Sequence, residues 1–280
     1  MKYSRRFLVT FYVFFIFIAA SQISISTAEP PGRIISLAPN ITEILFAMDL
    51  GDRIVGDTTY CDVPDAAKKK PKVGGMSNPS LEAVISLKPD VVIMTTDGNP
   101  QWFEERLRAF KIKTYVFRAR ELSELPQGIS DLGAFLGAKE KADALSGHIE
   151  AAMKNVSRLT VHSSRKKKVL FIIWPEPLIV AGPGTEIDDA ITLLGHENIA
   201  AGAKISYPHY SMEEILNNPP DVILIGKGHA DMKEMAKGLL NKVASVAAVK
   251  EGRVFFLSDS LYRLGPRVVP GIQEMAKCLN

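Results

Sequence analysis

The sequence predicts an α/β protein with two Rossmann-like lobes, mainly parallel sheets and one long helix that connects the lobes. Three observations support this fold class. Strand and helix patterns alternate along both halves of the chain, which is typical of parallel sheets. A segment of the first half also aligns without a gap on a segment of the second half. Finally, a single uninterrupted helical pattern, residues 139–163, separates the two halves.

The first 28 residues have the pattern of a secretory signal peptide. Lys2, Arg5 and Arg6 form a basic start, the apolar run Phe7–Ala20 follows, and Ser26-Thr27-Ala28 fits a cleavage site. A retained membrane anchor is the alternative, but the apolar run is shorter than the roughly 20 residues that span a bilayer. No cysteine lies near the cleavage site, so we expect an unlipidated periplasmic protein that begins at residue 29.

Without the signal peptide, the net charge and the length of the chain indicate its partners and its division into domains. The whole sequence has a formal net charge of +3, which the three basic residues of the signal peptide account for. The mature chain is therefore neutral, and nothing in it favours a nucleic-acid or anionic-membrane partner. Its length suits two lobes and a connector. We place the first lobe at residues 29–137, the connecting helix at 138–163 and the second lobe at 164–280.

Both halves contain the predicted elements in the same order. Apolar runs bounded by turn residues predict strands, and periodic apolar positions predict helices. In the first half, the expected order is strand Arg33–Ala38, helix Asn40–Met48 capped at Pro39-Asn40, strand Asp52–Asp57 and closing strand Lys113–Arg118. In the second half, it is strand Lys168–Trp174, helix Glu186–Leu194, return strand Glu197–Ala200 and closing strand Arg253–Ser258.

The internal repeat lies in the middle of each half. Ser80–Ile93 aligns on Ser211–Leu224, and each segment contains a capped helix, a Pro-Asp turn and an apolar strand. Proline cannot continue the helix, and aspartate favours the turn. The strand that follows is apolar at successive positions, so we expect it to be covered on both faces. Two such lobes facing each other predict a ligand cleft between them.

The central helical pattern, Lys139–Ser163, has one apolar face. The residues that form it recur at steps of three and four: Ala142, Leu145, Ile149, Ala152, Val156 and Leu159. A helix of this length would run roughly 35 Å, so it can contact both lobes. An ordinary crossover helix within one large sheet is the alternative, and the internal repeat favours the connecting helix.

Several motifs in order resemble the helical-backbone periplasmic receptors of ABC importers, which bind cobalamin, haem or ferric siderophores. In the first half these motifs are Arg33–Phe46, Tyr60–Pro64, Val73–Gly75 and Leu87–Val92, and in the second half Ala181–Gly184, Glu197–Ile199, Tyr207–Ser211 and Ser258-Asp259. The cobalamin-binding members look closest. The resemblance implies a monomeric receptor that undergoes modest closure, releases its ligand unchanged and delivers it to a permease dimer with ATPase subunits.

The resemblance also implies residues for the ligand site. In cobalamin-binding relatives, aromatic side chains from both lobes pack on the corrin ring, and rigid aromatic faces suit a large flat ligand. Matched by motif, the expected contacts are Tyr60, Trp174, Tyr207, Asp259 and Arg263, although a strand-end aromatic can belong to the core and Asp259 can cap a helix. The chain departs from these relatives at Ser260-Leu261, where they tend to carry aromatics, and at Met76, where one of them carries a tryptophan.

A haem or siderophore receptor is the nearest alternative. Tyr207, His209 and Tyr210 form a Tyr-Pro-His-Tyr run, and tyrosine and histidine both bind haem iron. An ordinary polar loop also explains this run. A receptor for bare zinc or manganese would need several converging ligands, and the histidines of this chain lie apart. We therefore expect no resident metal or cofactor, and expect the transported ligand to be cobalamin.

Glu82 and Glu213 occupy equivalent positions in the internal repeat. In the receptors that the chain resembles, two matching acids bind arginines of the permease. An acid in the first turn of a helix is also stabilised by the helix dipole without any partner. Glu214 stands three residues after Ser211, which is the capping-box spacing, so we expect Glu214 to be structural and Glu82 and Glu213 to dock.

An exported α/β enzyme acting on a metal-tetrapyrrole is the competing class. Gly182–Thr185 lacks the third glycine of a dinucleotide fingerprint and the lysine of a P-loop, and we find no nucleophile elbow. We therefore expect no catalytic residues. The two cysteines, Cys61 and Cys278, lie in different halves, and their spacing permits a disulfide without requiring one.

Overall fold

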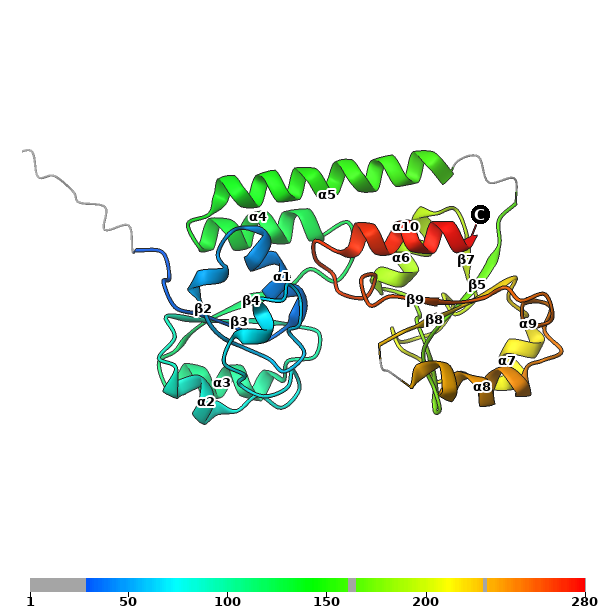
Figure 1. Ribbon diagram of the computed structural model, residues 1–280, viewed down its shortest axis with the longest axis horizontal. Coiled ribbons are helices and arrows are strands. Elements are labelled where there is room, and N and C mark those ends of the chain that lie inside the picture. The colour runs from blue at the N-terminus through cyan, green and yellow to red at the C-terminus, as the bar shows by residue number, and fades with distance from the viewer. Residues whose placement is uncertain (1–28, 161–164, 229–230, 280) are drawn as a thin grey trace, which may run out of the picture.

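The computed structural model describes residues 29–160, 165–228 and 231–279. Two α/β lobes lie side by side, and one long helix runs along both of them (Figure 1). The fold class predicted from the sequence is confirmed. The predicted signal peptide, residues 1–28, lies outside the described residues. Among the described helices, none combines the length and apolar character that a membrane span requires.

The first lobe contains a four-stranded parallel sheet in the order β2-β1-β3-β4. Its strands are β1 (Ile34–Ser36), β2 (Ile54–Asp57), β3 (Val91–Thr95) and β4 (Lys113–Phe117). Its helices are α1 (Pro39–Ala47), α2 (Leu81–Ser86), α3 (Gln101–Ala109) and α4 (Leu125–Phe135), with short 3-10 turns at Gly51–Arg53 and Ala67–Lys69. All five residues of β3 are buried, as expected for a strand covered on both faces.

The second lobe repeats this arrangement. Its strands are β5 (Lys168–Pro175), β6 (Leu178–Val180), β7 (Glu197–Asn198), β8 (Val222–Gly226) and β9 (Val254–Leu257). Strands β7, β8 and β9 extend the sheet in parallel from β5, and β6 is the antiparallel addition. The helices are α6 (Glu186–Leu193), α7 (Met212–Asn217), α8 (Met232–Lys242), α9 (Ala247–Lys250) and α10 (Val268–Leu279).

The internal repeat has the same structural role in both lobes. Ser80 caps α2 and Ser211 caps α7, and the predicted capping box between Ser211 and Glu214 is present. The aspartate of each Pro-Asp turn also holds the start of the neighbouring strand in the sheet. Asp90 accepts the backbone N–H of Arg33 at 2.8 Å before β1, and Asp221 accepts that of Lys168 at 2.8 Å at the start of β5.

One predicted helix start needs correction. The expected cap of the first helix was Pro39-Asn40, whereas α1 begins at Pro39 and Ala38 occupies the cap position without a side-chain hydrogen bond. Proline suits the first helical position because its fixed φ is already helical and its missing N–H would be unpaired there. The helix therefore starts directly after the β1 segment, which brings α1 to the carboxyl end of the sheet.

The connecting helix α5 (Lys139–Thr160) packs against α4 of the first lobe and α10 of the second (Figure 1). Ala142, Ile149 and Val156 of its predicted apolar face are buried. They belong to one apolar core that contains both Ile34 of β1 and Val169 of β5. The lobes therefore share a core along α5. The predicted end of this helix, Ser163, lies outside the described residues.

Candidate functional site

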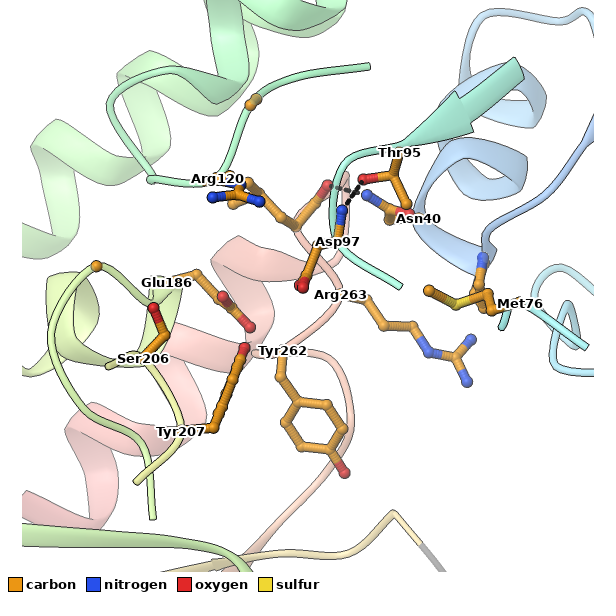
Figure 2. Close-up of a pocket in the computed structure, with 14 residues that line it drawn as sticks. Asn40, Met76, Thr95, Asp97, Arg120, Glu186, Ser206, Tyr207, Tyr262 and Arg263 are labelled. Atoms are coloured by element: carbon orange, nitrogen blue, oxygen red, sulfur yellow. Dashed lines mark hydrogen bonds between the residues drawn. The ribbon is translucent and has the colours of Figure 1, made fainter. Parts of the chain in front are cut away.

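A cavity of about 350 Å³ lies between the two lobes (Figure 2). The first lobe contributes Pro39, Asn40, Met76, Thr95, Asp97, Ala119 and Arg120, and the second contributes Gly184, Glu186, Ser206, Tyr207, Tyr262, Arg263 and Leu264. Several of these residues follow the carboxyl ends of parallel strands, where open α/β sheets bind their ligands. The predicted cleft between the lobes is therefore present, at the carboxyl edges of both sheets.

Asn99 holds the first-lobe wall of the cavity in place. Its side-chain amide donates to the backbone carbonyls of Leu37 and Met76, at 3.0 and 2.9 Å. Its side-chain oxygen accepts the backbone N–H of Thr95 at 2.8 Å. One side chain thus links the ends of β1 and β3 to the loop that carries Met76. Asn99 lies in the loop after β3, and this loop also presents Asp97 to the cavity (Figure 2).

Glu186 and Tyr207 form the second-lobe wall. Thr185 caps α6 through its side chain, so Glu186 is the first residue of that helix. The backbone N–H of Gly182 donates to the carbonyl of Ser206 at 2.7 Å, and a Cβ on Gly182 would lie 2.8 Å from the carbonyl oxygen of Ile205. This close approach of two loops brings Tyr207 beside Glu186, with the phenol oxygen directed toward the carboxylate (Figure 2).

Burial changes the titration of both side chains. Glu186 is 7% exposed, and burial raises its pKa to about 7, with Asp97 and Asp189 adding to the rise. Tyr207 is 36% exposed as a residue, but its phenol points into the cavity, where loss of solvent and then the negative charges of Glu186 and Asp97 raise its pKa. Both groups therefore favour their neutral forms more strongly than they would in water.

A cluster of ionised side chains joins the lobes beside the cavity. Arg263 of the second lobe pairs with two first-lobe acids, Glu43 at 3.1 Å and Asp62 at 2.6 Å. Arg267 donates to both carboxylate oxygens of Glu43 at 2.9 Å. Asp259 lies 2.6 Å from Arg263 and 3.1 Å from Arg267, so it holds the two guanidinium groups together. We call these five residues the interlobe ion cluster.

Tyr262 lines the cavity from the segment between β9 and α10. Its hydroxyl is buried and has no hydrogen-bond partner among the described residues. Burial raises its pKa to about 12, and the charge of Asp259 contributes. Gly228 allows the ring to lie close to the end of β8, because a Cβ there would be 3.1 Å from the Tyr262 oxygen. The ring of Tyr262 therefore faces the cavity, while its hydroxyl is buried against the end of β8.

Two of the five predicted ligand contacts line the cavity, Tyr207 and Arg263. Asp259 lies behind Arg263 as its ion-pair partner. Tyr60 is 57% exposed and lies outside the lining. Trp174 is also outside it: its indole N–H donates to the carbonyl of Glu176 at 2.8 Å, and its ring packs on the second-lobe core. The structure thus brings together Tyr207, Arg263 and Asp259, and does not bring Tyr60 or Trp174 to the cavity.

The Tyr-Pro-His-Tyr run has one member in the cavity, Tyr207. His209 pairs through its backbone with Ile179, and the Tyr210 hydroxyl donates to the carbonyl of Ile199 at 3.1 Å. Within residues 29–160, 165–228 and 231–279, no three His, Cys, Asp or Glu side chains are grouped so that they could hold a metal ion. Cys61 and Cys278, whose pairing the sequence left open, are both free.

Four residues that line the cavity were not predicted from the sequence: Glu186, Asp97, Arg120 and Tyr262. Asp97 and Arg120 follow the carboxyl ends of β3 and β4, and this position alone is a signal for them. Tyr262 directly follows Ser260-Leu261, the pair at which the chain was expected to have lost its aromatics. Leu261 is fully buried, and the aromatic side chain reaches the cavity from the next position along the chain.

Glu82 and Glu213 lie in the first turns of α2 and α7. Both are exposed, and neither makes a hydrogen bond or ion pair with another side chain of the described segments. Figure 1 shows α2 and α7 on the side of their lobes that faces away from α5. The two acids therefore occupy equivalent, accessible positions on the same side of the molecule.

The chain belongs to the periplasmic binding protein family, because the sequence pattern of that family matches residues 34–261. The fold and the interlobe cavity agree with this assignment. Members of the family are solute-binding proteins of ABC importers and not enzymes.

Similar proteins bind different ligands. The chain is 27% identical to a vitamin B12-binding protein of Photorhabdus laumondii, over 93% of this chain and 92% of the relative. It is 30% identical to an uncharacterised ABC transporter substrate-binding lipoprotein of Bacillus subtilis, over 93% of this chain and 83% of the relative. Among solved structures, the apo form of the periplasmic haem-binding protein RhuT from Roseiflexus sp. RS-1 superposes with a TM-score of 0.81 and 27% identity, covering 88% of this chain and 97% of that chain.

Proposed function

We propose that this chain is a periplasmic receptor that binds a corrinoid such as cobalamin between its lobes and delivers it to an ABC permease. The observation that carries the proposal is the cavity lined by both lobes at the carboxyl edges of their sheets. The vitamin B12-binding relative, which aligns over 93% of the chain, supports a corrinoid as the ligand. The basic and apolar start of the sequence supports export through a cleavable signal peptide.

Haem is the second candidate ligand, and the similarity to a haem-binding protein favours it. Tyrosine binds haem iron as the phenolate, and Tyr207 is the residue of the Tyr-Pro-His-Tyr run that lines the cavity. Burial and the nearby carboxylates raise the pKa of that phenol, which disfavours the phenolate. Coordination of haem iron by Tyr207 would therefore have to overcome the cost of ionising this phenol, whereas an aromatic contact with a corrin ring would not.

Cavity size also bears on how a corrinoid binds. At about 350 Å³, the cavity is near the lower end of the roughly 300–1,000 Å³ that is common for ligand pockets. A corrinoid with its nucleotide exceeds this volume. Binding therefore requires the lobes to separate slightly or part of the ligand to remain outside the cavity. The interlobe ion cluster lies beside the cavity, so such a separation would stretch its ion pairs.

We further propose that Glu82 and Glu213 dock the loaded receptor on the permease. Their exposure, their equivalent places in the repeat and their lack of partners in the described part of the chain support this role. Glu214, in contrast, is engaged in the capping box of α7. Arginines on the permease would complete the ion pairs that these two acids lack.

The ligand site is tested by comparing two aromatic variants in equilibrium dialysis with cyanocobalamin. Tyr207→Ala removes an aromatic wall of the cavity, so we expect the Kd to rise about tenfold or more, which corresponds to about 1.4 kcal/mol. Phe110→Ala is the control, because Phe110 is an exposed aromatic at the end of α3 and lies outside the cavity lining, and its Kd should stay within about twofold of wild type. Equal losses in both variants, or a loss only in Phe110→Ala, would contradict this placement of the ligand.

A further inference from the structure

The cavity contains more acidic than basic charge. In the interlobe ion cluster, three carboxylates (Glu43, Asp62 and Asp259) surround two guanidinium groups. The positive charge of Arg263 is therefore already compensated within the cluster. Deeper in the cavity, Asp97 and Glu186 face one arginine, Arg120. With all acids ionised, the site as a whole is negative.

Glu186 is the least compensated of these acids. Its side chain is more than nine-tenths buried and lines the cavity, yet it has no hydrogen bond to any other residue among those described. The hydrogen bond that lowers its pKa comes from its own backbone. A buried carboxylate without a partner is unfavourable, because it loses its hydration and gains nothing in return. Its oxygens are therefore free to accept hydrogen bonds from a ligand.

Asp97 faces Glu186 from the opposite lobe, and both carboxylates point into the same space in Figure 2. Arg120, the nearest cation, is directed elsewhere by hydrogen bonds. Its Nε donates to the side-chain oxygen of Thr96 at 3.2 Å, and its Nη2 lies 3.5 Å from the carbonyl of Thr96. No ion pair joins it to Asp97 or Glu186 in the described part of the chain. One acid from each lobe is thus presented to whatever occupies the cavity.

We propose that Glu186 and Asp97 set the ligand specificity of the cleft by accepting N–H groups of amide side chains and excluding ligands that carry carboxylates there. This inference rests on the proposed function, because corrinoids such as cobalamin carry amide side chains around the ring. Haem carries two propionate carboxylates instead. The same two acids would repel those propionates while binding the amides of a corrinoid.

The magnitude of this repulsion is substantial. Like charges at short range repel more strongly in a partly desolvated site than in bulk water, because the effective dielectric constant is lower there. A ligand carboxylate placed between Asp97 and Glu186 would meet two such charges. An amide in the same place donates two hydrogen bonds to ionised acceptors, which are stronger than bonds between neutral groups. The acid pair therefore weakens the binding of ligands with carboxylates at this place and strengthens the binding of ligands with amides.

The exclusion should weaken at low pH. Burial raises the pKa of Glu186 to about 7, so this carboxylate is ionised above that pH and neutral below it. The charged or titratable groups facing it are Asp97 from the loop after β3, Asp189 from α6 itself, Tyr207, and Arg120 from the segment after β4. Between pH 8 and pH 6, Glu186 therefore loses its negative charge, and a ligand carboxylate meets less repulsion.

The test measures binding of two corrinoids to the purified protein by equilibrium dialysis. Cobinamide carries amide side chains, and cobyrinic acid carries carboxylic acids in their place on the same ring. We expect wild type to bind cobinamide about 100-fold more tightly than cobyrinic acid at pH 8, and Glu186→Gln and Asp97→Asn each to improve cobyrinic acid binding about tenfold. Cobinamide binding should weaken only about threefold to tenfold in both variants, because the amide oxygen that replaces the carboxylate still accepts a hydrogen bond, although a weaker one.

Two further measurements separate this role from a structural one. Lowering the pH from 8 to 6 should improve cobyrinic acid binding in wild type, and this pH dependence should disappear in Glu186→Gln. Glu234→Gln, at an exposed glutamate of α8 outside the cavity, is the matched control and should behave as wild type. Unchanged selectivity in Glu186→Gln, with cobinamide still bound, would overturn this inference alone. Absence of binding of both corrinoids to wild type would overturn the proposed function and the inference with it.

Discussion

Glu43 is the acid that connects the two lobes most directly. Its side chain is 3% exposed, and it pairs with both Arg263 and Arg267 across the lobe boundary. Such a buried pair need not stabilise the fold relative to apolar residues, but the loss of one partner leaves charge uncompensated at the interface. At the residue scale, the ion cluster therefore fixes how the lobes meet beside the cavity.

The first prediction concerns Glu43→Ala. This change leaves two guanidinium groups facing only Asp62 and Asp259, so we expect the free energy of unfolding to fall by about 3 kcal/mol. Urea denaturation followed by circular dichroism measures it. Asp143→Ala is the control, because Asp143 pairs with Lys139 on the exposed face of α5, and its loss should leave the free energy of unfolding nearly unchanged. Equal small effects in both variants would show that the ion cluster contributes little to lobe packing.

Part of the candidate site was predictable from the sequence because several motifs resemble those of known periplasmic receptors. Tyr207 and Arg263 were matched to ligand contacts through this resemblance, and both line the cavity. Glu186 was not found, because an acid directly after a Thr cap is also the ordinary choice for a helix N-terminus. Its burial results from the approach of the loop that carries Tyr207, and the contact between Gly182 and that loop is tertiary. The pattern of a single sequence does not contain such information.

At the scale of elements, the prediction was more complete. The strands, the internal repeat and the connecting helix all follow from local patterns of apolar residues, turn residues and caps, which act over a few positions. The predicted elements differ from the structure at their ends, as at α1, where proline at the first helical turn moved the start by one residue. Strand β6 and helices α3, α4, α8, α9 and α10 were not predicted from the sequence. The packing of α4 on α5 could not be foreseen, because it depends on one glycine at the point where the helices cross.

The second prediction concerns that glycine. A Cβ on Gly133 of α4 would lie 2.0 Å from the Cβ of Ala142 on α5, so Gly133→Ala must push the helices apart. We expect a loss of about 1–3 kcal/mol in the free energy of unfolding. Gly147→Ala on α5 is the matched control, because a Cβ at Gly147 would meet no described neighbour within 4 Å, and alanine should stabilise the helix by about 0.5–1 kcal/mol. Opposite signs for the two substitutions in urea denaturation are expected, and stabilisation by both would refute close packing at Gly133.

At the scale of the whole molecule, α5 and the shared apolar core make the lobes one cooperative unit. The core extends from β1 of the first lobe through the buried face of α5 to β5 of the second lobe. Direct contacts between the lobes add to it: Asp189 accepts the backbone N–H of Leu122 at 2.9 Å, and Asn40 donates to the carbonyl of Leu264 at 3.2 Å. Such a connection suits small lobe movements around the ligand.

The third prediction follows from this shared core. The chain has two tryptophans, Trp102 in the first lobe and Trp174 in the second. Trp102→Phe and Trp174→Phe therefore yield proteins whose fluorescence reports on one lobe at a time. In urea, each variant should show one transition whose fluorescence midpoint coincides with its midpoint by circular dichroism. A fluorescence midpoint that differs from the circular dichroism midpoint in either variant would mean that the lobes unfold separately.

The fourth prediction concerns docking. Charge reversal in the double variant Glu82→Lys and Glu213→Lys should abolish uptake of the ligand into cells that produce the matching permease, while the Kd for the ligand stays within about twofold. The control double variant, Glu140→Lys and Glu150→Lys, makes the same charge change on the exposed side of α5 and should transport normally. Loss of ligand affinity in the first variant, or loss of uptake in both, would argue against docking through α2 and α7.

The most direct test of the central claim is isothermal titration calorimetry of the purified protein with cyanocobalamin, with haem titrated in parallel under the same conditions. We expect saturable binding of one cyanocobalamin per chain, with haem binding more weakly because its propionates would face Asp97 and Glu186. Saturable one-to-one binding of haem, together with no binding of cyanocobalamin, would contradict this claim.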